Sequence, residues 1–147
     1  KIFSLVMLLA VALTGCKKSN NGDGPNVGGT VLSGEWVLTS WNEAEPEFNV
    51  YINFSDDNTF EIYQQVWSFD YELYTGKYVV TGDVMTGTYA DGSNWACGYK
   101  VNVVDGQLTM YSQEDQSVTS LYEKCTIPEE IKTEASTTRA MEVVPFL

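Results

Sequence analysis

Histidine is absent from the 147-residue sequence, which limits the chemistry that its side chains could perform. Without histidine there can be no serine–histidine–aspartate triad, no cysteine–histidine pair and no histidine-ligated metal site. Two cysteines, Cys97 and Cys125, make a poor zinc site on their own. A glycine-rich phosphate loop and a dinucleotide-binding fingerprint are also missing. We therefore predict that the protein is not an enzyme and uses neither a cofactor nor a resident metal.

Acidic residues are numerous, with 20 Asp and Glu against 8 Lys and Arg. Two carboxylates could supply acid–base chemistry of the glycosidase kind, but no constellation singles out such a pair. Residues 56–58 (Asp-Asp-Asn) and residues 91–94 (Asp-Gly-Ser-Asn) could offer oxygen ligands to Ca²⁺. The same residue types form turns through side-chain to backbone hydrogen bonds, and we favour turns. The net charge of −12 repels nucleic acid, so we expect no nucleic-acid partner.

A third cysteine, Cys16, lies between an apolar segment and a polar tract. Residues 2–13 are apolar except for Ser4, a length within the range of about 7–15 residues for a signal-peptide core and short of a membrane span. Because Lys1 is not an initiating methionine, we expect the sequence to begin inside a longer basic segment. Residues 17–30 are polar and could not fold alone, which is typical of a flexible tether.

The residues Leu-Thr-Gly-Cys at 13–16 resemble a bacterial lipobox. The resemblance implies that the signal peptide is cleaved before Cys16 and that this residue then carries acyl chains, palmitate among them, which hold it stably in a membrane. It implies a location in the envelope of a Gram-negative bacterium, at the periplasmic or surface face of the outer membrane. An ordinary signal peptide with a chance cysteine is the alternative.

Eight short runs of alternating polarity, separated by turn residues, follow from Leu32 onward and predict β-strands. They are residues 35–42, 48–55, a strand through Phe60, Ile62 and Val66, and residues 71–80, 83–90, 94–104, 107–113 and 117–125. Asp-Gly at 91–92 and at 105–106 favours hairpin turns. Short links make neighbouring strands antiparallel, and closure of the sheet removes its unpaired edges.

We therefore predict an all-β fold, an eight-stranded antiparallel up-and-down meander barrel with a short C-terminal helix. A two-sheet sandwich is the alternative. The helix is expected from about Pro128 to Ala135, where a threonine cap and an early proline are typical of a helix start. The predicted organisation is a signal peptide (1–15), the lipidated cysteine and tether (16–31), the barrel (32–127), and the helix and tail (128–147).

The residues Gly34-Glu35-Trp36, which open the first strand, resemble the Gly-x-Trp start of lipocalins. Together with the lipobox, the tether and the segments FSDDNTFEIY, YADGSNW and YEKCTIPEE, they are similar to the lipocalin-like domains of small bacterial lipoproteins. The resemblance covers residues 32–130. It implies that Gly34 and Trp36 close one end of the barrel, with a basic residue over the tryptophan. The single arginine, Arg139, lies far from the expected position, and Lys124 and Lys132 lie nearer.

The sequence is compatible with two functions. The resemblance implies a non-catalytic envelope lipoprotein that carries a small hydrophobic ligand inside the barrel. Inward-facing candidates for that ligand are Phe48, Val50, Ile52, Phe54, Phe60, Ile62, Trp95, Tyr99 and Val101. The alternative is an interaction module with a filled barrel that binds a glycan or an envelope protein through aromatic residues of its outer face. Candidates for that face are Tyr51, Tyr63, Trp67 and Tyr111, although cross-strand pairing also explains them. An interior cavity of about 300 Å³ or more would favour the carrier.

Strand direction separates the two cysteines of the predicted barrel. Cys97 lies near the start of its strand and Cys125 at the end of the next-but-one strand, which runs the same way. At about 3.3 Å per residue this places them on the order of 20 Å apart. A disulfide requires Cα atoms within about 7 Å, so we expect none.

Overall fold

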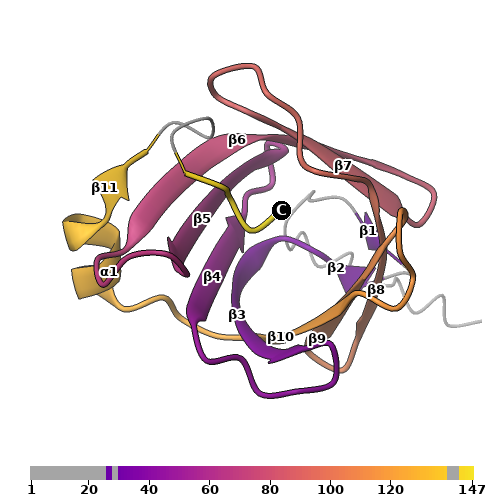
Figure 1. Ribbon diagram of the computed structural model, residues 1–147. Coiled ribbons are helices and arrows are strands. Elements are labelled where there is room, and N and C mark those ends of the chain that lie inside the picture. The colour runs from indigo at the N-terminus through magenta and orange to yellow at the C-terminus, as the bar shows by residue number, and fades with distance from the viewer. Residues whose placement is uncertain (1–25, 28–29, 139–142) are drawn as a thin grey trace, which may run out of the picture.

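The computed structural model describes residues 26–27, 30–138 and 143–147. Cys16 and Arg139 lie outside these residues. Eight antiparallel strands form a closed barrel (Figure 1). They are β3 (Gly34–Trp41), β4 (Asn49–Phe54), β5 (Thr59–Gln65), β6 (Glu72–Thr81), β7 (Val84–Tyr89), β8 (Tyr99–Val104), β9 (Gln107–Ser112) and β10 (Thr119–Lys124). Each strand pairs with the next along the chain, and β10 pairs back onto β3. The predicted meander barrel is therefore confirmed.

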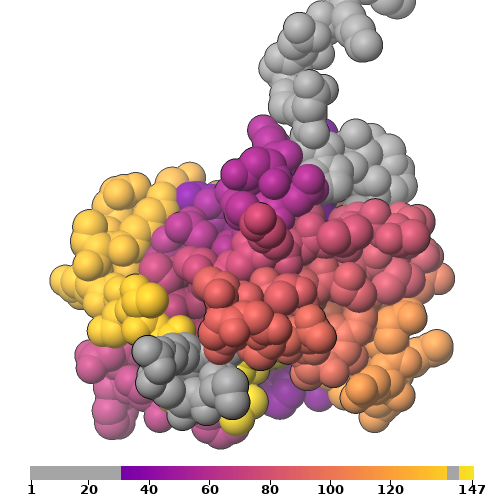
Figure 2. All heavy atoms as spheres, turned by 90° about the horizontal axis from the view of Figure 1, so that it is seen from above, coloured from indigo at the N-terminus to yellow at the C-terminus, as the bar shows by residue number. Residues whose placement is uncertain are grey.

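Short elements at both ends of the sequence complete the fold. Strands β1 (Asn26–Val27) and β2 (Thr30–Val31) form a separate two-stranded sheet. Helix α1 (Glu129–Glu134) lies within the range predicted for it. After it comes β11 (Ser136–Thr137), which was not predicted and which pairs in parallel with the start of β6. Seen from above, the yellow part of the chain, which includes α1, forms one flank of the molecule (Figure 2).

The predicted strand over residues 94–104 is too long by residues 94–98, because β8 begins only at Tyr99. Asn94 makes an isolated bridge to Thr88 instead. The N–H of Trp95 donates a 3.0 Å hydrogen bond to the carbonyl of Gly87. A Cβ atom at Gly87 would overlap the Trp95 indole, so the absence of a side chain there admits the ring. The segment before β8 therefore folds back on β7.

Large aromatic side chains fill the barrel. The largest fully buried side chains include those of Trp36, Tyr74, Tyr78, Tyr122, Phe54 and Phe60. Rings from facing strands pack together, with centroids 5.0 Å apart for Phe54 and Tyr78 and 5.1 Å for Phe60 and Trp95. Both separations lie within the range favoured by aromatic pairs. The interior is thus a packed core.

The closed end of the barrel is the end where β3 begins and β10 finishes. Trp36 is fully buried there, and its Nε1 donates a 2.9 Å hydrogen bond to the carbonyl of Leu32. The Nζ of Lys124 lies 4.4 Å from the centre of the Trp36 ring and donates to the carbonyl of Ser33. Gly34 has φ +123°, and a Cβ there would overlap the Lys124 Nζ. Lys124 is therefore the basic residue that the Gly-x-Trp resemblance implied.

Helix α1 packs on the outside of the barrel. Ile127 and Ile131 form a second apolar cluster with Tyr63 of β5. The carboxylate of Glu35 on β3 accepts a 2.7 Å hydrogen bond from the Ile127 N–H and lies 2.8 Å from the Nζ of Lys132. Burial raises the pKa of Glu35, but these two partners outweigh it and hold that pKa below its ordinary value.

The two cysteines lie in different clusters, and both thiols are free. Cys97 packs against the barrel core, with its Sγ 3.3 Å from the Oγ of Ser112, whereas Cys125 lies in the outer cluster near α1. Ser112 ends β9, and the opposite end of β9, at Gln107, pairs with Glu123. The predicted placement of Cys97 and Cys125 at opposite ends is confirmed.

Substitution of Trp36 by alanine should cost about 3–5 kcal/mol of unfolding free energy, because it leaves a large cavity at the closed end. Urea denaturation measures the loss. Trp67→Ala is the matched control, since Trp67 is 67% exposed, and it should shift the midpoint far less. Equal midpoints for wild type and Trp36→Ala would show that the closed end does not depend on this ring.

Glu35 should make stability depend on acid. Its folded pKa is lowered, so its contribution is present above the ordinary value near 4.5 and is lost as the pH falls through the folded pKa. Glu35→Gln should therefore lower the unfolding free energy at pH 7 by about 1–2 kcal/mol and flatten its decline below pH 4.5. Denaturation midpoints between pH 3 and 7 test this, with Glu130→Gln, an exposed residue of helix α1, as the control. Parallel pH profiles for wild type and Glu35→Gln would contradict it.

Candidate functional site

The open end of the barrel is the end where β3 finishes at Trp41 and β5 finishes at Gln65. The chain segment Val143–Leu147 lies across it, and Figure 1 shows this yellow segment ending over the centre of the barrel. Leu147 is buried in the core. Phe146 and Leu147 of this apolar segment pack against the core of the barrel, and they do so at its mouth.

The side chain of Gln64 holds this segment as a neighbouring strand would. Its Nε2 donates to the carbonyl of Val144 at 3.3 Å, and its Oε1 accepts from the N–H of Phe146 at 2.8 Å. Pro145, between them, has no N–H to satisfy. Gln64 is fully buried, and its Nε2 also lies 3.3 Å from an oxygen of Glu72. The amide is therefore fixed in place to bind extended backbone.

Three other side chains donate to backbone oxygens of the same segment. The hydroxyl of Tyr89 donates to Leu147 at 2.6 Å, and the indole Nε1 of Trp67 donates to Val144 at 2.9 Å. The hydroxyl of Tyr74 lies 3.5 Å from the carbonyl of Val143. Donors from β5, β6, β7 and the β5–β6 loop thus converge on the mouth.

Aromatic rings provide the apolar wall of the mouth. The Phe146 ring lies 5.6 Å from that of Phe48 and 6.2 Å from that of Trp41. Around it, Trp67 and Phe69 of the β5–β6 loop are 67% and 98% exposed. The mouth therefore combines an apolar wall, a ring of exposed aromatics and several hydrogen-bond donors, which are the features of a small-molecule site.

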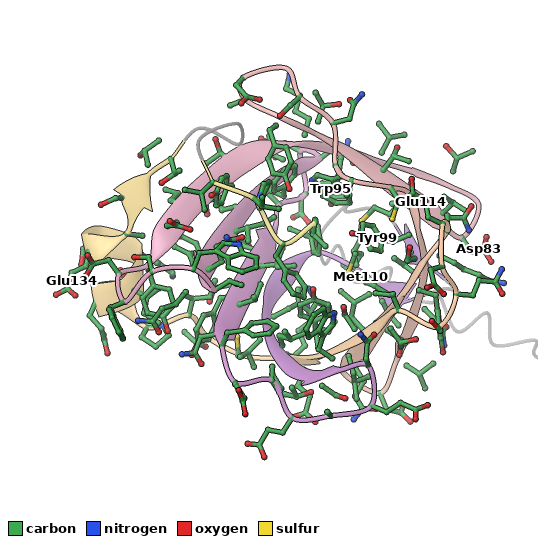
Figure 3. The ribbon with its side chains drawn as sticks, in the orientation of Figure 1. Asp83, Trp95, Tyr99, Met110, Glu114 and Glu134 are labelled. Atoms are coloured by element: carbon green, nitrogen blue, oxygen red, sulfur yellow. The ribbon has the colours of Figure 1, made fainter. Side chains whose placement is uncertain are left out.

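Two further donors lie beneath the segment without a partner. The Trp95 Nε1 and the Tyr122 hydroxyl are buried and have no hydrogen bond. Figure 3 shows Trp95, Tyr99 and Met110 directed into the barrel, whereas Asp83, Glu114 and Glu134 point away from it. Burial raises the pKa of Tyr89, Tyr99 and Tyr122, so these phenols stay protonated and can donate at neutral pH.

The predicted inward-facing residues all contribute to the interior, but they contact one another and leave it filled. Buried in the core are Val50, Ile52, Phe54, Phe60, Ile62, Trp95, Tyr99 and Val101, with Phe48 half-buried at the mouth. Hollows of about 540 and 450 Å³ open instead on the outer surface. The first lies over β5–β7 and has Phe60 in its lining, and the second is lined by Tyr111, Lys100 and Gln113.

The four residues predicted for the outer face differ in how exposed they are. Tyr63 lies on the outer face but is buried under Ile127 and Ile131, so its predicted availability to a partner is wrong. Tyr51 is half-buried, with its ring 6.1 Å from that of Tyr71. Trp67 and Tyr111 are exposed as predicted. Sequence reasoning missed Trp41, Gln64 and Phe69. The signal available for Gln64 was a polar residue at an inward position, between Ile62 and Val66.

The aspartate-rich segments form turns, as favoured. Asp57 accepts hydrogen bonds from the N–H and hydroxyl of Thr59, and Asp91 accepts the same pair from Ser93. Asp115 accepts the same pair from Ser117. Within residues 26–27, 30–138 and 143–147, no group of three acidic or cysteine residues is placed to hold a metal ion. None of the helices in this same part of the chain is long and apolar enough to cross a membrane.

Known proteins share this architecture. The sequence profile of the lipocalin-like domain family matches residues 32–110. The crystal structure of a lipocalin-like protein from Bacteroides uniformis superimposes with a TM-score of 0.51 at 16% sequence identity. The match covers 98% of that protein and 64% of this chain, and it shows a common fold. No curated protein matches the sequence.

Proposed function

Because the chain belongs to the lipocalin-like domain family, we propose that it is a non-catalytic binding protein that takes a small, mainly apolar ligand at the open end of its barrel. Proteins of this fold generally bind ligands and do not catalyse reactions. The observation that carries the proposal is the convergence of Gln64, Tyr74, Tyr89 and the Trp67 indole on one aromatic-walled mouth.

The interior is filled, which by the criterion of cavity volume argues against a ligand inside the barrel, so the ligand we propose binds at one end of it. Trp36 and Lys124 obstruct the closed end, and the rings of the core occupy the middle. An eight-stranded barrel is just wide enough for its own side chains or one small ligand. At the mouth the space is filled by Val143–Leu147, which is not part of the barrel strands. A ligand can therefore bind there without disturbing the hydrogen bonds between strands.

We place this binding protein in the cell envelope, as a lipoprotein anchored through Cys16. The lipobox and the polar tether support this location. Leu32 lies two residues before the first barrel strand, β3, and packs at the closed end beside Trp36. In an anchored protein the tether then meets the closed end, and the open end with Trp67 and Phe69 is the end remote from the attachment.

A glycan-binding outer face is the second candidate. The hollow of about 450 Å³ is lined by the half-exposed ring of Tyr111 and by the polar side chains of Lys100, Gln113 and Gln116. An aromatic face beside hydrogen-bonding side chains is suited to a sugar ring. This candidate leaves the barrel mouth occupied by the chain's own residues.

Native mass spectrometry of the protein purified from its host in a mild detergent tests the binding proposal. We expect a noncovalent adduct of small-molecule mass, whose abundance is altered by Tyr89→Phe and unchanged by Tyr78→Phe. The Tyr78 hydroxyl donates to Ser55 at the opposite end and serves as the matched control. An adduct that is indifferent to Tyr89→Phe but lost in Tyr111→Ala would replace the proposed site with the outer hollow. Observation of unliganded mass alone would contradict both sites.

The anchor is tested by Cys16→Ala, expressed in the host with a fatty-acid probe. Because no other residue of a lipobox accepts the acyl groups, labelling should disappear and the precursor should remain uncleaved. Cys125→Ala is the control and should label like wild type. Undiminished labelling of Cys16→Ala would contradict lipidation at this residue.

A further inference from the structure

The segment Val143–Leu147 occupies the mouth without belonging to the barrel's sheet. Its backbone forms no strand and is bound by side chains, through Gln64, Tyr89 and the Trp67 indole. All eight barrel strands are paired on both sides by one another. Removal of the segment therefore leaves all the hydrogen bonds between the barrel strands in place.

We propose, on the basis of the proposed function, that Val143–Leu147 is an internal occupant of the ligand site that the ligand displaces. The ligand is an elongated apolar molecule that carries uncharged carbonyl oxygens, as a peptide or an ester does. The segment stands in for that ligand: Phe146 and Leu147 represent its apolar body, and the backbone carbonyls represent its oxygens.

The hydrogen bonds of the mouth specify the carbonyl oxygens. The donors on Gln64, Trp67 and Tyr74 meet the backbone carbonyls of Val143 and Val144. The Tyr89 hydroxyl meets the backbone oxygen of Leu147. Deeper in the barrel, the Trp95 Nε1 and the Tyr122 hydroxyl are buried donors that the segment leaves without a partner. Both donors belong to the packed core, so a ligand that binds at the mouth does not need to reach them.

The charge around the mouth specifies that these oxygens are uncharged. An oxygen of Glu72 lies 3.3 Å from the Gln64 Nε2, directly beside the donor that meets Val144. The whole sequence carries a formal charge of −12. A ligand carboxylate would be repelled by both, whereas an amide or ester carbonyl would not.

The segment is also exposed enough to be released. The side chain of Val144 is 68% exposed, and Phe146 is only half-buried. Leu147 alone is buried in the core, where the Tyr89 hydroxyl binds its carbonyl. Local unfolding is easier for a segment that makes few buried apolar contacts than for paired strands. The backbone of this segment is bound by side chains and not by a neighbouring strand.

Binding of N-phenyl-1-naphthylamine, an uncharged fluorescent probe without carbonyl oxygens, tests the displacement. The chain lacking residues 143–147 should bind the probe at least tenfold more tightly than the full chain. In the full chain, Tyr89→Phe removes one hydrogen bond to the segment and should tighten probe binding about fivefold. Tyr78→Phe, at the closed end, should leave it unchanged.

Competition for the probe in the shortened chain tests the ligand class. The peptide acetyl-VVPFL-amide and the ester monolaurin represent the two sources of an uncharged carbonyl, and lauric acid supplies a carboxylate of similar apolar length. At pH 7 the peptide, the ester or both should displace the probe at concentrations at least tenfold below that of laurate. Whichever of the two displaces better identifies the source.

The outcomes distinguish failure of the displacement from failure of the proposed ligand site. Equal probe affinity in full and shortened chains, with competition lost in Tyr89→Phe, overturns the displacement and leaves the mouth as the ligand site. Displacement by laurate at the same concentration as the ester overturns the uncharged class. A shortened chain that keeps the near-ultraviolet circular dichroism of a packed barrel yet binds no probe overturns both proposals. A shortened chain that fails to fold, together with equal probe binding by Tyr89→Phe and Tyr78→Phe, overturns the displacement.

Discussion

A closed eight-stranded sheet has an interior so narrow that its own side chains decide whether any space remains, and the other features of this structure depend on that constraint. Here large rings fill the middle, including those of Phe54, Tyr78, Phe60 and Trp95. These rings fit only where the strands lack side chains: Gly87 lies directly against the Trp95 indole, and a Cβ atom there would overlap the ring. Space for anything else is left to the ends.

The two ends of the barrel are finished in different ways. At one end Trp36 is buried, hydrogen-bonded to Leu32 and covered by Lys124, in an arrangement built from adjacent strands. At the other end the finishing segment comes from far along the chain, and Gln64 and Tyr89 bind its backbone. The first arrangement is part of the core, whereas the second resembles a bound ligand. This asymmetry is why we assign binding to the open end.

Local patterns in the sequence were enough to predict the barrel. The alternation around Val50, Ile52 and Phe54 predicts a half-buried strand, and the aspartate-containing turns set the strand order. The role of Trp36 came from the Gly-x-Trp resemblance, and the structure supplies the basic partner. These features depend on residues close together in sequence or on a short motif.

Contacts between distant parts of the chain could not be predicted in the same way. Tyr63 has the parity of an exposed residue, but Ile127 and Ile131 return from 60 or more residues away and cover it. Gln64 looked like an ordinary strand residue, because its partners Val144 and Phe146 lie about 80 positions later. The candidate site is built from such contacts, so strand periodicity alone could not reveal it.

The central claim is that the mouth is held by a segment that opens independently of the barrel, and amide hydrogen exchange measures this most directly. The Phe146 N–H, bonded to Gln64, should exchange at least a hundredfold faster than the paired amides of β4 and β5, through a local opening that depends little on denaturant. Exchange of the Phe146 amide at the same rate and with the same denaturant dependence as those strand amides would show that the segment is part of the global core, and would contradict the account.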